Sequence, residues 1–231
     1  MKLILTFSLL LFVYSTNAQF AVVSSDDGCA DVRIAPNSIA KISSPLQNNI
    51  AVLIDENYAD DNPGTEWVRV YFGQEPYCFD CTPDMTQHAS GYIHKSQLKV
   101  LEALEPVADT IFNIVYTLET FDPSDKNMIY DEGRDAIESI NGRAFFGADC
   151  GTPNTEIVKA VAFLQGSKDT YFYISMDFLW SILHADNHFT YYKNGDSYFA
   201  VQQVGEGACA TDLVWVFEPR GLKQRLMGGR L

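Results

Sequence analysis

Hydrophobic and polar residues alternate with a period of two in the stretch TEWVRVYFG, where three polar or aromatic positions are interleaved with Val68, Val70 and Phe72. This period is typical of a half-buried strand, and it predicts a strand from Trp67 to Phe72. Three more short strands are predicted in the N-terminal half: Asp31 to Ile34, Ala51 to Asp55, and Tyr92 to His94 with a tail to Val100. ENYADDNPGTE, before the Trp67 strand, is rich in turn-forming residues. Many short strands separated by turns favour a small barrel or sandwich.

The pattern changes after LEALEPVAD, residues 101–109, an acidic connector that contains a proline and indicates a domain boundary. SINGRAFFG, FTYYKNGDSYFAVQQV and DLVWVFEPRGLKQRLMG are then typical of hairpins, two of them built on Asn-Gly. TEIVKAVAFLQGSKDTYFYI fits either two strands around Gly166 and Ser167 or a helix after Pro153 and Asn154. MDFLWSIL is the best candidate for a helix. We therefore expect a second domain of α+β type, dominated by antiparallel strands.

The first eighteen residues have the pattern of a signal peptide. Lys2 precedes an apolar run from Leu3 to Val13, and Thr16-Asn17-Ala18 forms a cleavage site of small residues. A run of this length is too short to span a bilayer, which needs roughly 20 residues. We expect an exported protein, periplasmic or secreted, with no membrane span after signal cleavage.

Composition limits the partners. The 231-residue chain is 47% hydrophobic, enough for buried cores, and has a formal net charge of −14. A surface this acidic repels nucleic-acid phosphates and anionic lipids, so both are disfavoured as partners. The sequence contains no motif for a nucleotide or another cofactor, and we expect none. Acidic pairs such as Asp60-Asp61 and Asp131-Glu132 lie in turn-like surroundings and are interpreted as solvated.

Three spaced motifs resemble the bacterial SH3 (SH3b) family: DVRIAPNSIAKI, EWVRVYFG and GYIHKSQLKVL. The positions that match the family pattern are Val32, Arg33, Pro36, Ser38, Trp67, Val70, Gly91, Tyr92, Ile93 and His94. The resemblance implies a small β-barrel over residues 19–103 and recognition of peptidoglycan or a peptide. Residues 74–90 form an insertion, with two cysteines, where the family has a tight hairpin. The overall prediction is a mainly β protein, an SH3-like barrel followed by a β-rich α+β domain of unknown function over residues 104–231.

The turn after Arg33 has an architectural interpretation. Ala35-Pro36-Asn37-Ser38 reverses the chain between barrel strands. Arg33 can lay its aliphatic stem on apolar surface while its guanidinium satisfies loop carbonyls or a carboxylate. Segments of the second half look like domains of uncharacterised exported bacterial proteins, and that resemblance brings no known activity.

Cysteine use indicates structural disulfides, because exported cysteines tend to pair. Candidates are Cys29, Cys78, Cys81, Cys150 and Cys209, and the odd number leaves one thiol free, bound to another group or joined to another chain. Their spacing suggests a local group of the first three and a distal pair of the last two. An alternative is a zinc site of Cys78, Cys81, His88 and His94.

A catalytic alternative rests on GADCGTPN, which resembles the nucleophile segment of the NlpC/P60 cysteine peptidases but lacks the serine after the cysteine. Cys150 would be the nucleophile, with His184 or His188 as base. The two histidines stand four residues apart in HADNH, where Asp186 and Asn187 suggest a loop. A disulfide between Cys150 and Cys209 competes with this interpretation.

Aromatic residues are concentrated in the predicted barrel. Flat rings on a shallow groove suit sugars or peptides, so the predicted ligand-binding residues are Tyr58, Trp67, Tyr71 and Tyr92. We expect a non-catalytic protein that binds a cell-wall component or an envelope protein. A cell-wall cysteine hydrolase and an inhibitor or immunity-like protein with an acidic docking surface are the alternatives.

Overall fold

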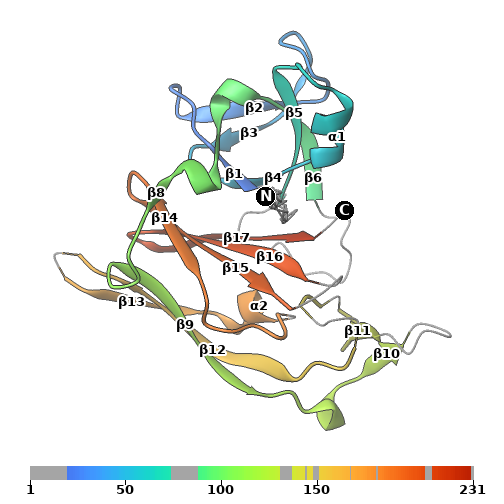
Figure 1. The fold of residues 1–231 in the computed structure, drawn as a ribbon, viewed down its shortest axis with the longest axis vertical. Coiled ribbons are helices and arrows are strands. Elements are labelled where there is room, and N and C mark those ends of the chain that lie inside the picture. The colour runs from blue at the N-terminus through green and yellow to red at the C-terminus, as the bar shows by residue number, and fades with distance from the viewer. Residues whose placement is uncertain are drawn as a thin grey trace, which may run out of the picture.

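The computed structural model describes residues 20–73, 88–130, 137–143, 145–147, 151–166, 168–180, 182–205 and 210–229. These residues form four antiparallel sheets and only short helices, so the expectation of a mainly β fold is confirmed. The predicted signal peptide, most of the insertion 74–90 and four of the five cysteines lie outside the described residues. Figure 1 shows the three larger sheets stacked as successive layers.

The N-terminal half forms a seven-stranded sheet in the order β3-β2-β6-β5-β4-β1-β7. Its strands are β1 (Phe20–Val23), β2 (Cys29–Arg33), β3 (Ile42–Gln47), β4 (Ala51–Ile54), β5 (Trp67–Gly73), β6 (His88–His94) and β7 (Leu98–Val100). Alternate residues of these strands meet in one core that includes Val32, Val52, Val70 and Ile93. The sheet therefore curls around a single interior, while membership of the SH3b family stays a prediction.

Gly91 allows this curl. A side chain at Gly91 would collide with the Val32 side chain and with the Arg33 carbonyl oxygen. β6 can cross close to β2 there because glycine has no Cβ atom. The glycine of the GYIH motif thus has a packing role.

A five-stranded sheet, β17-β16-β15-β14-β8, is the central layer. Its strands are β8 (Glu105–Pro106), β14 (Thr190–Asn194), β15 (Ser197–Val204), β16 (Thr211–Glu218) and β17 (Gly221–Gly229). The predicted hairpins around Gly195 and before Gly221 are both present. β16 is buried on both faces, so this sheet serves two cores.

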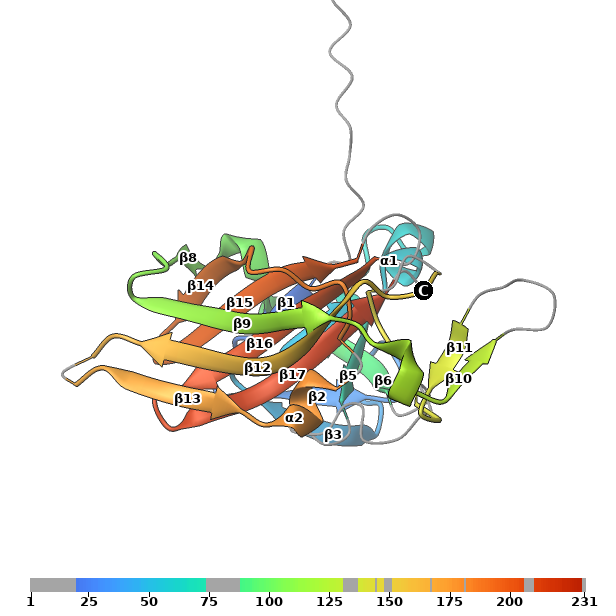
Figure 2. The same ribbon diagram turned by 90° about the horizontal axis from the view of Figure 1, so that it is seen from below.

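The third layer is a three-stranded sheet, β13-β12-β9, which Figure 2 shows from below. It comprises β9 (Phe112–Thr120), β12 (Thr155–Leu164) and β13 (Thr170–Ile174). TEIVKAVAFLQGSKDTYFYI therefore folds as two strands. A small hairpin of β10 (Met128–Tyr130) and β11 (Ile137–Ile140) lies beside this sheet, and Asn141 and Gly142 follow it with positive φ angles of 54° and 74°.

The helices are few and short in the described ranges: α1 (Glu56–Asp61), α2 (Met176–Leu179) and the 3₁₀ turns η2 (Lys95–Gln97), η3 (Leu101–Ala103) and η4 (Pro123–Asp125). α1 lies in the segment expected to be only turn, because Asp55 caps its first turn. Of the described residues of MDFLWSIL, only Met176–Leu179 are helical. None of these helices has the length and apolar character needed to cross a bilayer.

The two halves share a hydrophobic cluster between the seven-stranded and five-stranded sheets. One side includes Phe20 and Leu53, and the other Phe199, Val214 and Leu226. The opposite face of the central sheet packs on the three-stranded sheet through a larger cluster that includes Phe112, Ile157, Trp215 and Phe217. The predicted boundary at residue 104 lies between η3 and β8, next to the shared cluster.

Candidate functional site

The predicted ligand-binding residues of β5 and β6 lie on one surface of the sheet. Val68, Val70 and Phe72 enter the core, so Trp67, Arg69 and Tyr71 point to the other face. Across the strands, Trp67 is paired with His94, Arg69 with Tyr92, and Tyr71 with Ser90. We call the surface formed by Tyr58, Trp67, Arg69, Tyr71, Tyr92 and His94 the aromatic face.

The fourth predicted residue, Tyr58, reaches this face from α1. The Asp55 carboxylate accepts a hydrogen bond of 3.0 Å from the Tyr58 backbone N–H and so begins the helix. The Tyr58 and Tyr92 rings meet edge to face, with centroids 5.2 Å apart and planes at 64°. A helix that the sequence pattern did not reveal therefore brings two of the predicted residues together.

A polar network fixes the middle of the aromatic face. The Tyr71 hydroxyl donates to Asp55 Oδ2 at 3.0 Å, and an Arg69 guanidinium nitrogen lies 3.7 Å from the same oxygen. The Arg69 guanidinium also lies 5.2 Å from the Tyr71 ring centroid. Asp55 is buried, so this network holds Tyr71 and Arg69 in one arrangement.

The Tyr58 and Tyr71 phenols stay protonated at neutral pH. Burial, followed by the hydrogen bond to Asp55, raises the pKa of Tyr71 above its ordinary value. Burial and the neighbouring Tyr92 raise the pKa of Tyr58 in the same direction. Both hydroxyls therefore act as neutral hydrogen-bonding groups next to the flat rings.

Trp67 and His94 form the end of the aromatic face near η2. Their rings meet at 88° with centroids 5.4 Å apart. His94 Nδ1 lies 2.8 Å from the Ser96 hydroxyl oxygen and accepts from the Ser96 backbone N–H at 3.3 Å, which caps η2. In the zinc alternative, Cys78, Cys81 and the His88 side chain lie outside the described residues. Within those described, no three possible ligands gather to hold a metal ion.

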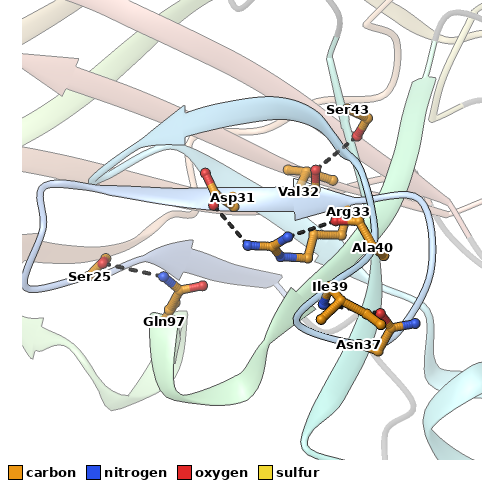
Figure 3. Close-up of polar contacts among 9 residues, drawn as sticks. All are labelled: Ser25, Asp31, Val32, Arg33, Asn37, Ile39, Ala40, Ser43 and Gln97. Carbon is orange, nitrogen blue, oxygen red and sulfur yellow. Dashed lines mark hydrogen bonds and ion pairs between the residues drawn. The ribbon is translucent and has the colours of Figure 1, made fainter.

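Arg33 shapes the loop at the other side of β6, as Figure 3 shows. Its guanidinium donates to the Ala40 carbonyl at 2.7 Å and to Asp31 Oδ2 at 3.1 Å. The prediction that Arg33 satisfies a loop carbonyl and a carboxylate is confirmed. Ile39, in the same turn, is 93% exposed.

The histidines of HADNH are engaged in separate local contacts. His184 Nε2 accepts from the Asn154 backbone N–H at 3.2 Å. His188 Nδ1 lies 2.7 Å from Asp186 Oδ2, with a side chain that is almost fully exposed. Cys150 and Cys209 lie outside the described residues, so their pairing and the catalytic alternative stay predictions. Cys29 forms no disulfide with any described residue.

Arg69 and Asp55 belong to the site, although neither was among the ligand-binding residues predicted from the sequence. Arg69 alternates with Trp67 and Tyr71, and this period of two already placed it on their face. Asp55 was counted as the end of a strand, although an aspartate before ENYADD is a suitable helix cap. Both could have been found from local sequence.

Comparison of the chain with protein-family models, with curated proteins and with solved structures gives no match.

Proposed function

We propose that this protein is an exported, non-catalytic binding protein whose aromatic face recognises a cell-wall component, with peptidoglycan as the ligand. The observation that carries the proposal is the gathering of Tyr58, Trp67, Tyr71 and Tyr92 on one partly exposed surface next to Arg69. The resemblance to SH3b domains and the predicted signal peptide support the same function.

The chemistry of the aromatic face suits a chain of sugars that carries peptides. Aromatic rings stack on the apolar faces of sugars, and neutral phenols hydrogen-bond to hydroxyl and amide groups. The Arg69 side chain is 40% exposed, and its polar contacts with Asp55 at 3.7 Å and with Ser90 at 3.5 Å are both long, so part of its guanidinium is available to a carboxylate of a stem peptide. A mixed ligand of this kind would use all of these groups.

Binding to purified, insoluble peptidoglycan tests the proposal. The double variant Tyr58→Ala/Tyr92→Ala removes the edge-to-face pair without touching the core. We expect its apparent dissociation constant to rise about tenfold or more, since an aromatic anchor contributes over about 1 kcal/mol. The bound fraction after sedimentation is the measurement, and far-UV circular dichroism verifies the fold.

Tyr130→Ala is the matched control, because Tyr130 is an exposed tyrosine of β10, in the other half of the chain. It should bind like the wild type. Equal binding by the double variant and the wild type would contradict the proposal. Release of soluble fragments would instead favour the hydrolase alternative with Cys150.

A further inference from the structure

Two open hollows adjoin in the third layer of the molecule, which the central sheet separates from the aromatic face. One hollow, of about 340 Å³, lies on the outer surface of the three-stranded sheet. The other, of about 760 Å³, lies beside the edge of β9, between that strand and the start of β14. Asn113 and Val115 of β9 line both hollows. We call the combined depression, which crosses β9, the β9 groove.

The outer part of the β9 groove is apolar and aromatic. Asn113 of β9 is paired with Phe163 of β12, which is paired in turn with Tyr171 of β13. The Phe163 and Tyr171 rings lie with centroids 5.1 Å apart and planes at 47°. Tyr171 is 64% exposed. The two rings therefore offer a stacking surface that suits the apolar face of a sugar.

The part of the groove beside β9 is polar. Asp109 and Thr190 line it with exposed side chains, together with Asn113. None of these three side chains hydrogen-bonds to another described residue. A carboxylate, a hydroxyl and an amide together supply acceptors and donors, and sugar hydroxyls use both.

The charges around the groove favour an uncharged ligand. Asp109 has no ion-pair partner among the described residues, whereas His188 is paired with Asp186 at 2.7 Å. Lys159 lies outside the lining, with Nζ 5.2 Å from the Tyr173 ring centroid. Asp109 and the formal net charge of −14 repel an anion. A cation would gain one exposed carboxylate, and exposed ion pairs contribute little.

An extended peptide often binds at a sheet edge as an added strand, and Figure 2 shows β9 at one edge of the three-stranded sheet. Here the outward backbone groups in the middle of β9 are occupied by side chains. The Ile114 N–H donates to the Tyr191 hydroxyl at 3.2 Å. Asn187 bonds to the N–H and the carbonyl of Tyr116 at 2.7 Å and 3.2 Å. Strand addition would break these three bonds, so the groove binds through its side chains.

We propose that the β9 groove binds an uncharged oligosaccharide whose sugars are linked equatorially, as in cellulose or chitin. One sugar stacks on Tyr171 and Phe163, and the next crosses β9, where it hydrogen-bonds to the Asn113 amide. Hydroxyl groups farther along the chain bond to Asp109 and Thr190. A chain with this linkage is flat, so it fits an open groove. The site is independent of the aromatic face, and its failure would leave the peptidoglycan proposal unaffected.

Cellohexaose and chitohexaose are the probes, because both are uncharged and have this linkage. In an isotope-labelled protein, Asn113→Ala identifies the side-chain N–H signals of Asn113. At least one of the two hexasaccharides should shift these signals in a saturable way. The same shift should persist in Tyr58→Ala/Tyr92→Ala, which separates this site from the aromatic face. The absence of a saturable shift with both probes would overturn the proposal.

Two tyrosines of β13 provide a matched pair of substitutions. Tyr171→Ala removes the stacking ring and should raise the dissociation constant about fivefold or more. Tyr173 is 75% exposed on the same strand but lies outside the lining of both hollows, so Tyr173→Ala should bind like the wild type. Equal binding by the Tyr171 variant and the wild type would overturn the proposal.

Two further ligands test the chemical class. The glucuronate analogue of cellohexaose has the same backbone with carboxylates, and it should bind severalfold more weakly at low salt. Asp109→Asn should recover part of this loss. An uncharged hexapeptide of alanine and serine should leave the Asn113 signals unchanged. Binding of the glucuronate chain or of the hexapeptide as tight as that of the neutral sugars would contradict the proposed ligand.

Discussion

Two side-chain amides make the same pair of hydrogen bonds in opposite parts of the molecule. Gln224 of β17 accepts from the Ala51 N–H at 2.8 Å and donates to the Ala51 carbonyl at 2.9 Å. Asn187 does the same to Tyr116 of β9, at 2.7 Å and 3.2 Å. Each amide satisfies the N–H and the carbonyl of one backbone residue, as a neighbouring strand would. Gln224 is buried at the contact between the two halves, whereas Asn187 is exposed beside the edge of the three-stranded sheet.

From this difference we expect solvent access, more than geometry, to determine how much such a contact stabilises the fold. When Asn187 is lost, water can reach the backbone of Tyr116 and replace the bonds. When Gln224 is lost, the polar atoms of Ala51 stay between hydrophobic neighbours, and an unpaired buried group retains its full desolvation penalty. The larger penalty for unpaired or lost groups in buried positions predicts the rank of the following substitutions.

The largest effect is expected at Trp215, which lies on the same side of the central sheet as Asn187 but is fully buried. Its Nε1 donates to the Tyr116 hydroxyl at 2.7 Å, and burial raises the pKa of Tyr116 so that the phenol stays neutral. Trp215→Ala should lower the free energy of unfolding by about 3–5 kcal/mol. Urea denaturation measures the loss. A loss of unfolding free energy smaller than the loss caused by Gln224→Ala would show that position in the layers affects stability more than burial does.

Gln224→Ala should cost about 1–3 kcal/mol, because both polar atoms of Ala51 lose their partner. Gln224→Met keeps the size of the side chain and should cost nearly as much. Gln203→Ala, at an exposed position of β15, is the control and should leave the urea midpoint unchanged. If Gln224→Met were as stable as the wild type, packing and not hydrogen bonding would explain the contact.

Asn187→Ala should cost less, about 0.5–1.5 kcal/mol, because water replaces the lost bonds. Hydrogen exchange of the Tyr116 amide should become faster while exchange at the Ala51 amide stays the same. Equal losses of stability in the Asn187 and Gln224 variants would contradict the comparison.

The smallest effect is expected at His188, next to Asn187, whose contribution to stability depends on pH. The hydrogen bond from His188 to Asp186 raises the pKa of His188 above its ordinary value of 6.5. Protonated His188 therefore stabilises the folded state fully below pH 6.5, and this contribution is lost as the pH rises through the raised pKa. In an NMR titration, Asp186→Asn should return the His188 midpoint toward the ordinary value. An unchanged midpoint would exclude Asp186 as the cause.

The sequence predicted local features better than long-range ones. The strands around Val70 and Ile93 and the bonds of Arg33 follow from alternation and from turn chemistry, which depend on near neighbours. β1 was missed because all four of its residues are buried, so no alternation appears. β3 was missed for the opposite reason, since its residues are largely exposed.

The rest of the site and fold depended on partners far along the chain. Nothing near Gln224 in the sequence indicates that its amide bonds to Ala51. The four aromatic members Tyr58, Trp67, Tyr71 and Tyr92 were predicted, but Arg69 and the arrangement of the face were not, because α1 and the Asp55 network bring these residues together.

The bond between Gln224 and Ala51 joins residues 173 positions apart. Contacts of such long range close only after a large loss of chain entropy, and proteins rich in them fold slowly. β4 can acquire this partner only after β17 has been synthesised. We therefore expect the contact between the two halves to form late in folding, with β17 as the strand whose arrival completes it.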